Sequence, residues 1–141
     1  MSKANRKNHM SDQLFVITRG GESHPLFPHA ASVSAGRFIF VSGQLALDKD
    51  GNTVGKGDMR AQLRQVGENL KAALEEAGAS LDDIIKSNTY VTDMQAFFGC
   101  MDVRREYFGK AFPTSTTVEV SRLADPDMLI EIEAIAVVDD N

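Results

Sequence analysis

The stretch LIEIEAIAVV, residues 129 to 138, has the pattern of a β-strand that is largely apolar on both faces. Side chains alternate across a strand. One face carries only aliphatic residues: Ile130, Ile132, Ala134, Ala136 and Val138. The other face adds two glutamates to aliphatic residues: Leu129, Glu131, Glu133, Ile135 and Val137. A strand of this kind is typical of a sheet that is covered on both sides.

A long amphipathic helix precedes this strand in the sequence. From Asp58 onward, apolar residues recur at spacings of three and four, with charged residues between them: Met59, Leu63, Val66, Leu70, Leu74 and Ala77. This period predicts a helix with Asp58 as its N-cap and Gly78 just beyond its end. A second helix is predicted to start at Asp93 and to carry Met94, Phe97, Phe98, Met101 and Phe108.

Residues rich in β-branched and aromatic side chains predict further strands at 14–18, 37–43, 84–92 and 115–121. The first two are expected to form a hairpin-like pair. The order of elements predicts an α+β layer in which two helices cover one face of a mixed sheet. Because the other face would remain bare, we expect copies of the chain to cover each other's sheets in an oligomer.

Composition and charge restrict the class of protein. The 141 residues fit one domain, which we place at residues 13–141 after a flexible polar tail at 1–12. A net charge of −5 disfavours nucleic acid as a partner, and the sequence has no apolar run of the ~20 residues that a membrane span requires. A single cysteine, Cys100, and a polar N-terminus without a secretory signal predict a cytoplasmic protein.

Three motifs resemble the RidA/YjgF family of reactive-intermediate deaminases, whose members are also labelled endoribonuclease L-PSP. They are SGQ at 42–44 after a strand, Gln62 and Asn69 seven residues apart in the first helix, and EIEAIA at 131–136. The resemblance runs from about Val33 to Val138. It implies a chorismate-mutase-like α+β subunit and a homotrimer with three clefts between subunits.

The resemblance also implies a chemistry. The best-known branch of the family hydrolyses imines and enamines such as 2-aminoacrylate to a 2-keto acid and ammonia, without a cofactor or a metal. The resemblance implies that the Glu131 carboxylate positions the attacking water and transfers its protons, and that Ser42, Gly43, Gln44 and Asn69 contact the substrate. In that branch an arginine in a P-A-R-S pattern holds the substrate carboxylate.

This chain departs from the pattern at the arginine. The matching proline is Pro113, so the arginine position is occupied by Ser115, and Thr117 replaces the family's cysteine on the same side of the strand. A serine cannot form the bidentate, charge-assisted pair that an arginine forms with a carboxylate. We therefore expect little activity on simple imines derived from amino acids. A tyrosine of the family is matched by His29, which titrates near neutral pH.

The predicted site thus has Glu131, Ser115 and His29 as catalytic residues and Ser42, Gly43, Gln44, Asn69 and Thr117 as substrate-binding residues, with no cofactor and no metal. Purely structural roles remain open as alternatives. Residues 42–44 can form a simple strand-terminal turn, Asn69 can brace a loop, and the hydroxyls of Ser115 and Thr117 can be ordinary strand residues. For Glu133, two residues after Glu131, we expect an ion pair at a subunit interface. Arg122, on the opposite face from Ser115, is a poor replacement for the missing arginine.

Two classes of function remain open. One is a hydrolase of a small imine, enamine or enol-type metabolite. The other is a trimer that binds a small ligand or regulates without catalysis. An endoribonuclease or translation inhibitor is a weaker alternative, because the acidic charge would repel RNA.

Overall fold

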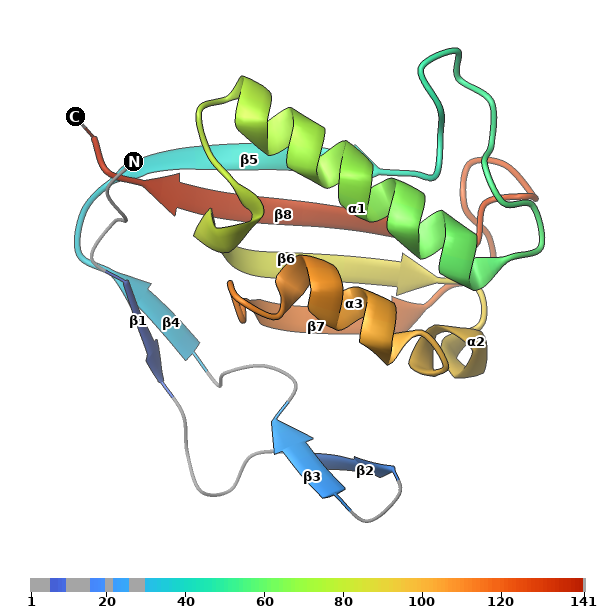
Figure 1. Ribbon diagram of the computed structural model, residues 1–141, viewed down its shortest axis with the longest axis horizontal. Helices are drawn as coiled ribbons and strands as arrows, with labels where there is room; N and C mark the ends of the chain where they lie inside the picture. The colour runs from blue at the N-terminus through green and yellow to red at the C-terminus, as the bar shows by residue number, and fades with distance from the viewer. Residues whose placement is uncertain (1–5, 10–15, 20–21, 26–29, 141) are drawn as a thin grey trace.

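Strand β8 (Ile130–Val138) lies inside a four-stranded mixed sheet with the order β5-β8-β6-β7 (Figure 1). It pairs antiparallel with β5 (Arg37–Gln44) on one side and with β6 (Ile84–Val91) on the other. Strand β7 (Thr114–Glu119) pairs parallel with β6 and forms one edge. The computed structural model describes residues 6–9, 16–19, 22–25 and 30–140. The α+β class and the mixed sheet that the sequence predicts are confirmed.

Helices α1 (Met59–Glu76), α2 (Met94–Phe98) and α3 (Met101–Phe108) lie together on one face of this sheet (Figure 1). A short 3-10 turn at Leu81–Asp83 leads from α1 into β6. The predicted N-cap is confirmed, because the Asp58 carboxylate accepts a hydrogen bond from the Ala61 amide. The single second helix was a wrong prediction. The backbone leaves the helical conformation at Cys100 (φ −115°, ψ 21°), which separates α2 from α3.

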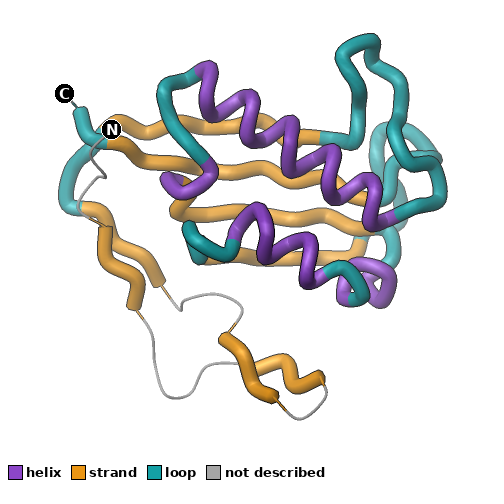
Figure 2. The backbone as a smooth tube through the Cα atoms, in the orientation of Figure 1, coloured by secondary structure: helices purple, strands orange, loops and turns teal. Residues whose placement is uncertain are grey.

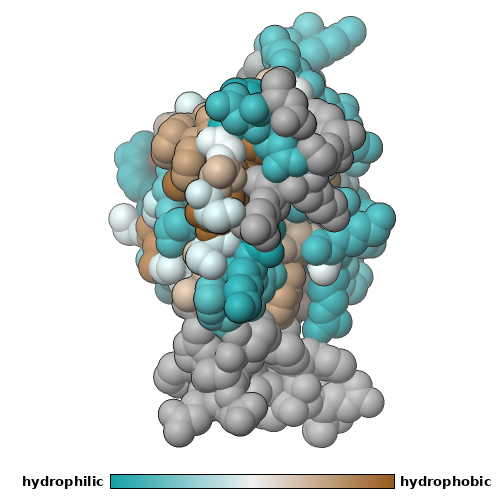
Figure 3. Space-filling view, turned by 90° about the vertical axis from the view of Figure 1, so that its left-hand side faces the viewer, coloured by the Kyte–Doolittle hydropathy of each residue, from teal (hydrophilic) through white to brown (hydrophobic). Residues whose placement is uncertain are grey.

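The two faces of β8 differ in burial as the alternation predicts. Every residue of the aliphatic face is buried against the helices, together with the apolar face of α1. On the opposite face of the sheet, Phe38 and Phe40 of β5 are 55% and 74% exposed and stack on each other at 6.4 Å between ring centroids. Figure 3, which looks along the sheet from the end near the C-terminus, shows hydrophobic side chains gathered on one flank. One face of the sheet is therefore open in the protomer.

The N-terminal region forms two short ribbons outside the main sheet (Figure 2). Strand β1 (Arg6–His9), within the stretch predicted as a tail, pairs with β4 (Ala30–Val33). Strand β2 (Val16–Arg19) pairs with β3 (Glu22–Pro25). The expected pairing of 14–18 with 37–43 is wrong, because β5 pairs with β8 instead. Two residues separate β2 from β3 in the sequence, so their pairing closes a much shorter loop.

Candidate functional site

A β-bulge at the end of β5 brings Gly43 and Glu131 together. The register with β8 shifts between Val41, which pairs with Ala134, and Gln44, which pairs with Ile132. A Cβ added at Gly43 would overlap the Glu131 carboxylate and would come within 2.9 Å of its Cδ atom. The missing side chain of Gly43 thus makes room for the carboxylate, and bulges of this kind are frequent beside active sites.

The two glutamates of β8 have different surroundings. Glu133 accepts hydrogen bonds from the Tyr90 hydroxyl (2.8 Å) and from Asn88 Nδ2 (3.0 Å), which lower the pKa of Glu133. Among the described residues, no hydrogen bond or ion pair engages Glu131. Glu133 lines a hollow of about 170 Å³ together with Phe40 and Lys86. Glu133 is therefore a structural group of the open face, whereas the Glu131 carboxylate is available for chemistry.

Ser115 and Thr117 lie on the helix side of the sheet. The Ser115 hydroxyl accepts a hydrogen bond from Ser87 Oγ (3.2 Å), and Thr117 pairs in register with Thr89. Both partners on β6 are buried beneath the helices. The shared face of Ser115 and Thr117 is confirmed. Within one protomer, however, Ser115 and Glu131 lie on opposite faces of the sheet, and the structure does not bring them together.

The two helix residues of the family motif brace loops. Asn69 donates through Nδ2 to the carbonyl oxygens of Leu45 and Leu47, both at 2.9 Å. Its Oδ1 atom accepts a hydrogen bond from Gln65. These contacts hold the chain that follows β5 against α1. Of the two roles that the sequence left open for Asn69, loop bracing is the one that its contacts support.

Gln62 has the same function about two turns earlier in α1. It is fully buried, donates to the carbonyl oxygens of Gly55 (3.1 Å) and Asp127 (2.7 Å), and accepts from the Leu129 amide (2.8 Å). This one side chain joins the loop before α1 to the start of β8. It therefore fixes the backbone two residues before Glu131.

The remaining predicted residues are placed as follows. Ser42 is exposed on the bulge, and its carbonyl oxygen accepts a hydrogen bond from Gln44 Nε2 (3.0 Å). His29 lies outside the described residues. Arg122 is exposed in the loop after β7, which ends at Glu119.

A buried arginine on α3 was missed from the sequence. Arg104 is only 9% exposed, its guanidinium carbon lies 5.4 Å from the centroid of the Phe108 ring, and burial lowers the pKa of this arginine to about 10. The helical spacing of the sequence could have revealed its burial, because Arg104 lies one turn after Cys100 and one turn before Phe108, on the apolar side of the helix.

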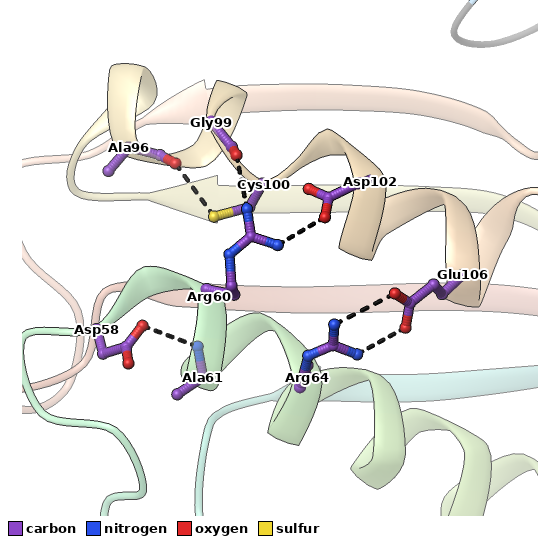
Figure 4. Close-up of polar contacts among 9 residues, drawn as sticks. All are labelled: Asp58, Arg60, Ala61, Arg64, Ala96, Gly99, Cys100, Asp102 and Glu106. Atoms are coloured by element: carbon purple, nitrogen blue, oxygen red, sulfur yellow. Dashed lines mark hydrogen bonds and ion pairs between the residues drawn. The ribbon is translucent and has the colours of Figure 1, made fainter.

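Two ion pairs connect α3 to α1 (Figure 4). Arg60 of α1 pairs with Asp102 at 2.7 Å, and Arg64 pairs with Glu106 at 2.6 Å. The face of α3 that carries Asp102 and Glu106 therefore looks toward α1. Exposed pairs of this kind add little stability, but they show which face of α3 lies toward α1.

Two further findings concern the part of the chain that the structure describes. None of its helices combines the length and the apolar character of a membrane span. Its His, Cys, Asp and Glu side chains form no group of three that could hold a metal ion.

The fold and site define a small α+β protein with an available carboxylate on the open face of a mixed sheet. The chain matches the model of the family described as Endoribonuclease L-PSP over residues 22–138. It is 48% identical to a RutC family protein of Pyrococcus horikoshii over 121 residues, which cover 86% of this chain and 95% of that protein. The chain belongs to this family, also called the RidA/YjgF or RutC family.

Solved structures agree with the family and the fold. A Rid family protein of unknown function from Yersinia pestis matches with a TM-score of 0.79 and 31% identity, covering 95% of this chain and 99% of that one. A member of the YjgF/YER057c/UK114 family from Mycobacterium tuberculosis matches with a TM-score of 0.63 and 30% identity, covering 95% and 100%.

Proposed function

We propose that the protein is a cofactor-independent hydrolase that acts on the C=N bond of a small imine or enamine metabolite, with an enol-type substrate as the nearest variant. The observation that carries the proposal is the Glu131 carboxylate, which has no hydrogen-bond or ion-pair partner among the described residues and lies against Gly43 at a bulge, while the neighbouring Glu133 is engaged by Tyr90 and Asn88. A carboxylate held in this way can accept a proton from water and return it to the leaving nitrogen.

The reaction needs no other co-reactant than water. Water adds to the carbon of the protonated imine while Glu131 takes one water proton, which gives a neutral carbinolamine. Glu131 returns this proton to nitrogen, the C–N bond breaks as the hydroxyl proton passes to Glu131, and the products are a carbonyl compound and ammonia, which takes up the remaining proton. The exposed Ser42 on the same bulge supplies polar groups beside the reacting carbon.

The proposed site lies between two subunits of a homotrimer. Ser115 and Thr117 lie on the helix side of the edge strand β7, whereas Glu131 lies on the open side. One cleft can contain both groups only if they come from different copies of the chain. The exposed Phe38 and Phe40 give the open face an apolar surface for such a neighbour.

The test measures ammonia release from a panel of freshly generated small imines and enamines against the spontaneous rate, because the serine at position 115 makes little activity expected on 2-iminobutanoate alone. We expect Glu131→Gln to lower the enzymatic rate by about 10²-fold to 10⁴-fold, the usual range for a general acid–base group. Glu133→Gln is the matched control: it makes the same change two residues away and keeps an acceptor for Tyr90 and Asn88.

Equal rates for the wild-type protein and Glu131→Gln would contradict the proposed role of the carboxylate. A wild-type protein that leaves imines at their spontaneous rate would contradict the hydrolase and favour a trimer that only binds a small ligand. RNA is not proposed as a substrate, because the net charge of −5 opposes phosphate binding.

A further inference from the structure

Arg104 is a buried cation without a carboxylate partner. Among the described residues, its side chain forms no hydrogen bond or ion pair; its guanidinium carbon lies 5.4 Å from the centroid of the Phe108 ring, and the like charge of Arg105 is nearby. Removing a guanidinium from water without a counter-charge costs folding free energy, and buried charges are ordinarily paired. A protein that keeps such a group has a reason to present a cation at this place.

The side chain projects toward strand β7. Asp102 and Glu106 both pair with α1, and Arg104 lies two residues from each, so it points about 200° around the helix from them. It therefore points away from α1. Because it is nevertheless buried, it lies between α3 and the part of the sheet under that helix, which is β6 and the edge strand β7 (Figure 1).

Arg104 is level with the middle of β7. Helix α3 lies in the crossover between the parallel strands β6 and β7, so it runs antiparallel to them. Residues near the centre of α3 therefore face residues near the centre of β7, where Ser115 and Thr117 occupy the helix side. The hydroxyl of Ser115 accepts from Ser87 and keeps its own proton for a ligand.

The guanidinium group has solvent contact although the side chain is buried. In the described residues, every fully buried side-chain nitrogen or oxygen has a hydrogen-bond partner, and Arg104 forms no hydrogen bond through its side chain. Its nitrogens are therefore not fully buried. The packed stem and the Phe108 ring thus hold the guanidinium mostly buried, with a small contact to solvent and with donors that have no hydrogen-bond partner among the described residues.

We propose that Arg104 is the anion-binding residue of the cleft, and that it receives the carboxylate of a small 2-keto or 2-imino acid together with the Ser115 hydroxyl. This proposal rests on the same cleft as the proposed function. The arginine that is absent from position 115 would be replaced from the helix that covers this strand. A planar guanidinium with free donors suits a carboxylate, and a held orientation reduces the entropy lost on binding.

The test compares Arg104→Met with Arg105→Met in the full-length protein. Methionine keeps an unbranched apolar stem at position 104 and removes the buried charge, so the fold is expected to persist. Arg105 is exposed on the same helix, and its replacement removes an equal charge one residue away. Calorimetry or ligand-observed NMR measures binding of 2-oxobutanoate and of its neutral analogue 2-oxobutanamide.

We expect Arg104→Met to weaken 2-oxobutanoate binding by about tenfold to a hundredfold, the value of one charge-assisted contact. Arg105→Met should bind as the wild-type protein does, and the amide should bind equally to all three. An unchanged affinity of Arg104→Met for the keto acid would overturn the proposal, as would a wild-type protein that does not bind it at millimolar concentration. A loss that is equal for the acid and the amide would show a purely structural role and would also overturn it.

Failure of the proposed function is distinguishable from failure of this inference. Binding of 2-oxobutanoate does not depend on hydrolysis, so a protein that turns over no imine can still show the loss specific to Arg104. Conversely, a hydrolysis rate that falls in Glu131→Gln but is unchanged in Arg104→Met would support the hydrolase and exclude Arg104 as its anion-binding residue.

Discussion

Replacing Gln62 by leucine should destabilise the protein strongly, although the new side chain is apolar, buried and of similar size. Gln62 is fully buried and serves three backbone groups: the carbonyl oxygens of Gly55 and Asp127 and the amide of Leu129. Leucine can pair with none of them. Two loops and the start of β8 therefore lose their common anchor.

The magnitude follows from the number of orphaned groups. Each buried polar group left without a partner costs about 1 to 3 kcal/mol. The carbonyl of Asp127 belongs to an exposed residue and can form a hydrogen bond to water instead. We therefore expect the free energy of unfolding to fall by about 3 kcal/mol in total, less than the full cost of three unpaired groups. This is a large part of the ~5 to 15 kcal/mol by which domains are stable, and it corresponds to a fall of about 10 °C in the melting temperature.

The assay is equilibrium unfolding in urea at a fixed protomer concentration, with Gln65→Leu as the control. Gln65 lies on the same helix and is half-buried, and among the described residues its side chain bonds only to that of Asn69, so its replacement should cost under about 1 kcal/mol. Equal stability of the two variants would refute the reasoning, because it would mean that the backbone groups near Gln62 find other partners.

Two further predictions concern the open face. The hydrogen bonds from Tyr90 and then Asn88 lower the pKa of Glu133 in the folded protein. This network therefore stabilises the fold above the carboxyl's pKa of ~4.3 in the unfolded chain. The stabilisation is lost as the pH falls through the lowered pKa of the folded state. Tyr90→Phe should thus destabilise the protein at pH 7 and less at pH 3 in thermal unfolding, and an equal loss at both would contradict the network. Replacing both Phe38 and Phe40 by serine should turn the expected trimer into monomers in analytical ultracentrifugation; a wild-type protein that sediments as a 15.4 kDa monomer would rule out the trimer.

The elements that the sequence predicted well are those with an unbroken local period. Alternation predicted the buried aliphatic face of β8, although Val137 on the other face is buried as well, and the spacing of three and four predicted α1 and its N-cap. The break between α2 and α3 was missed because Phe97 and Met101 are four residues apart, so the apolar spacing continues across it. The pairing of β5 with β8 joins segments almost a hundred residues apart, and no local pattern encodes it.

The candidate site was predictable only in part for the same reason. The motifs pointed to Gly43 and Glu131, which do meet, and alternation placed Ser115 and Thr117 on one face. Whether Ser115 and Thr117 lie on the same face of the sheet as Glu131 depends on the combined register of β7, β6 and β8. The position of the Arg104 side chain depends on how α3 is rotated over the sheet, which the ion pairs with α1 show but no local pattern in the sequence encodes.

The placement of Ser115 and Glu131 on opposite faces of one sheet would make catalysis a property of neighbouring copies rather than of single chains. Two inactive proteins, one with Glu131→Gln and one with Arg104→Met, would then repair each other when their chains are refolded together. With random mixing in equal amounts, about a quarter of the clefts in a cyclic trimer would contain an intact carboxylate and an intact arginine. A cell that carries two differently damaged copies of the gene would by this means regain activity that neither copy encodes alone.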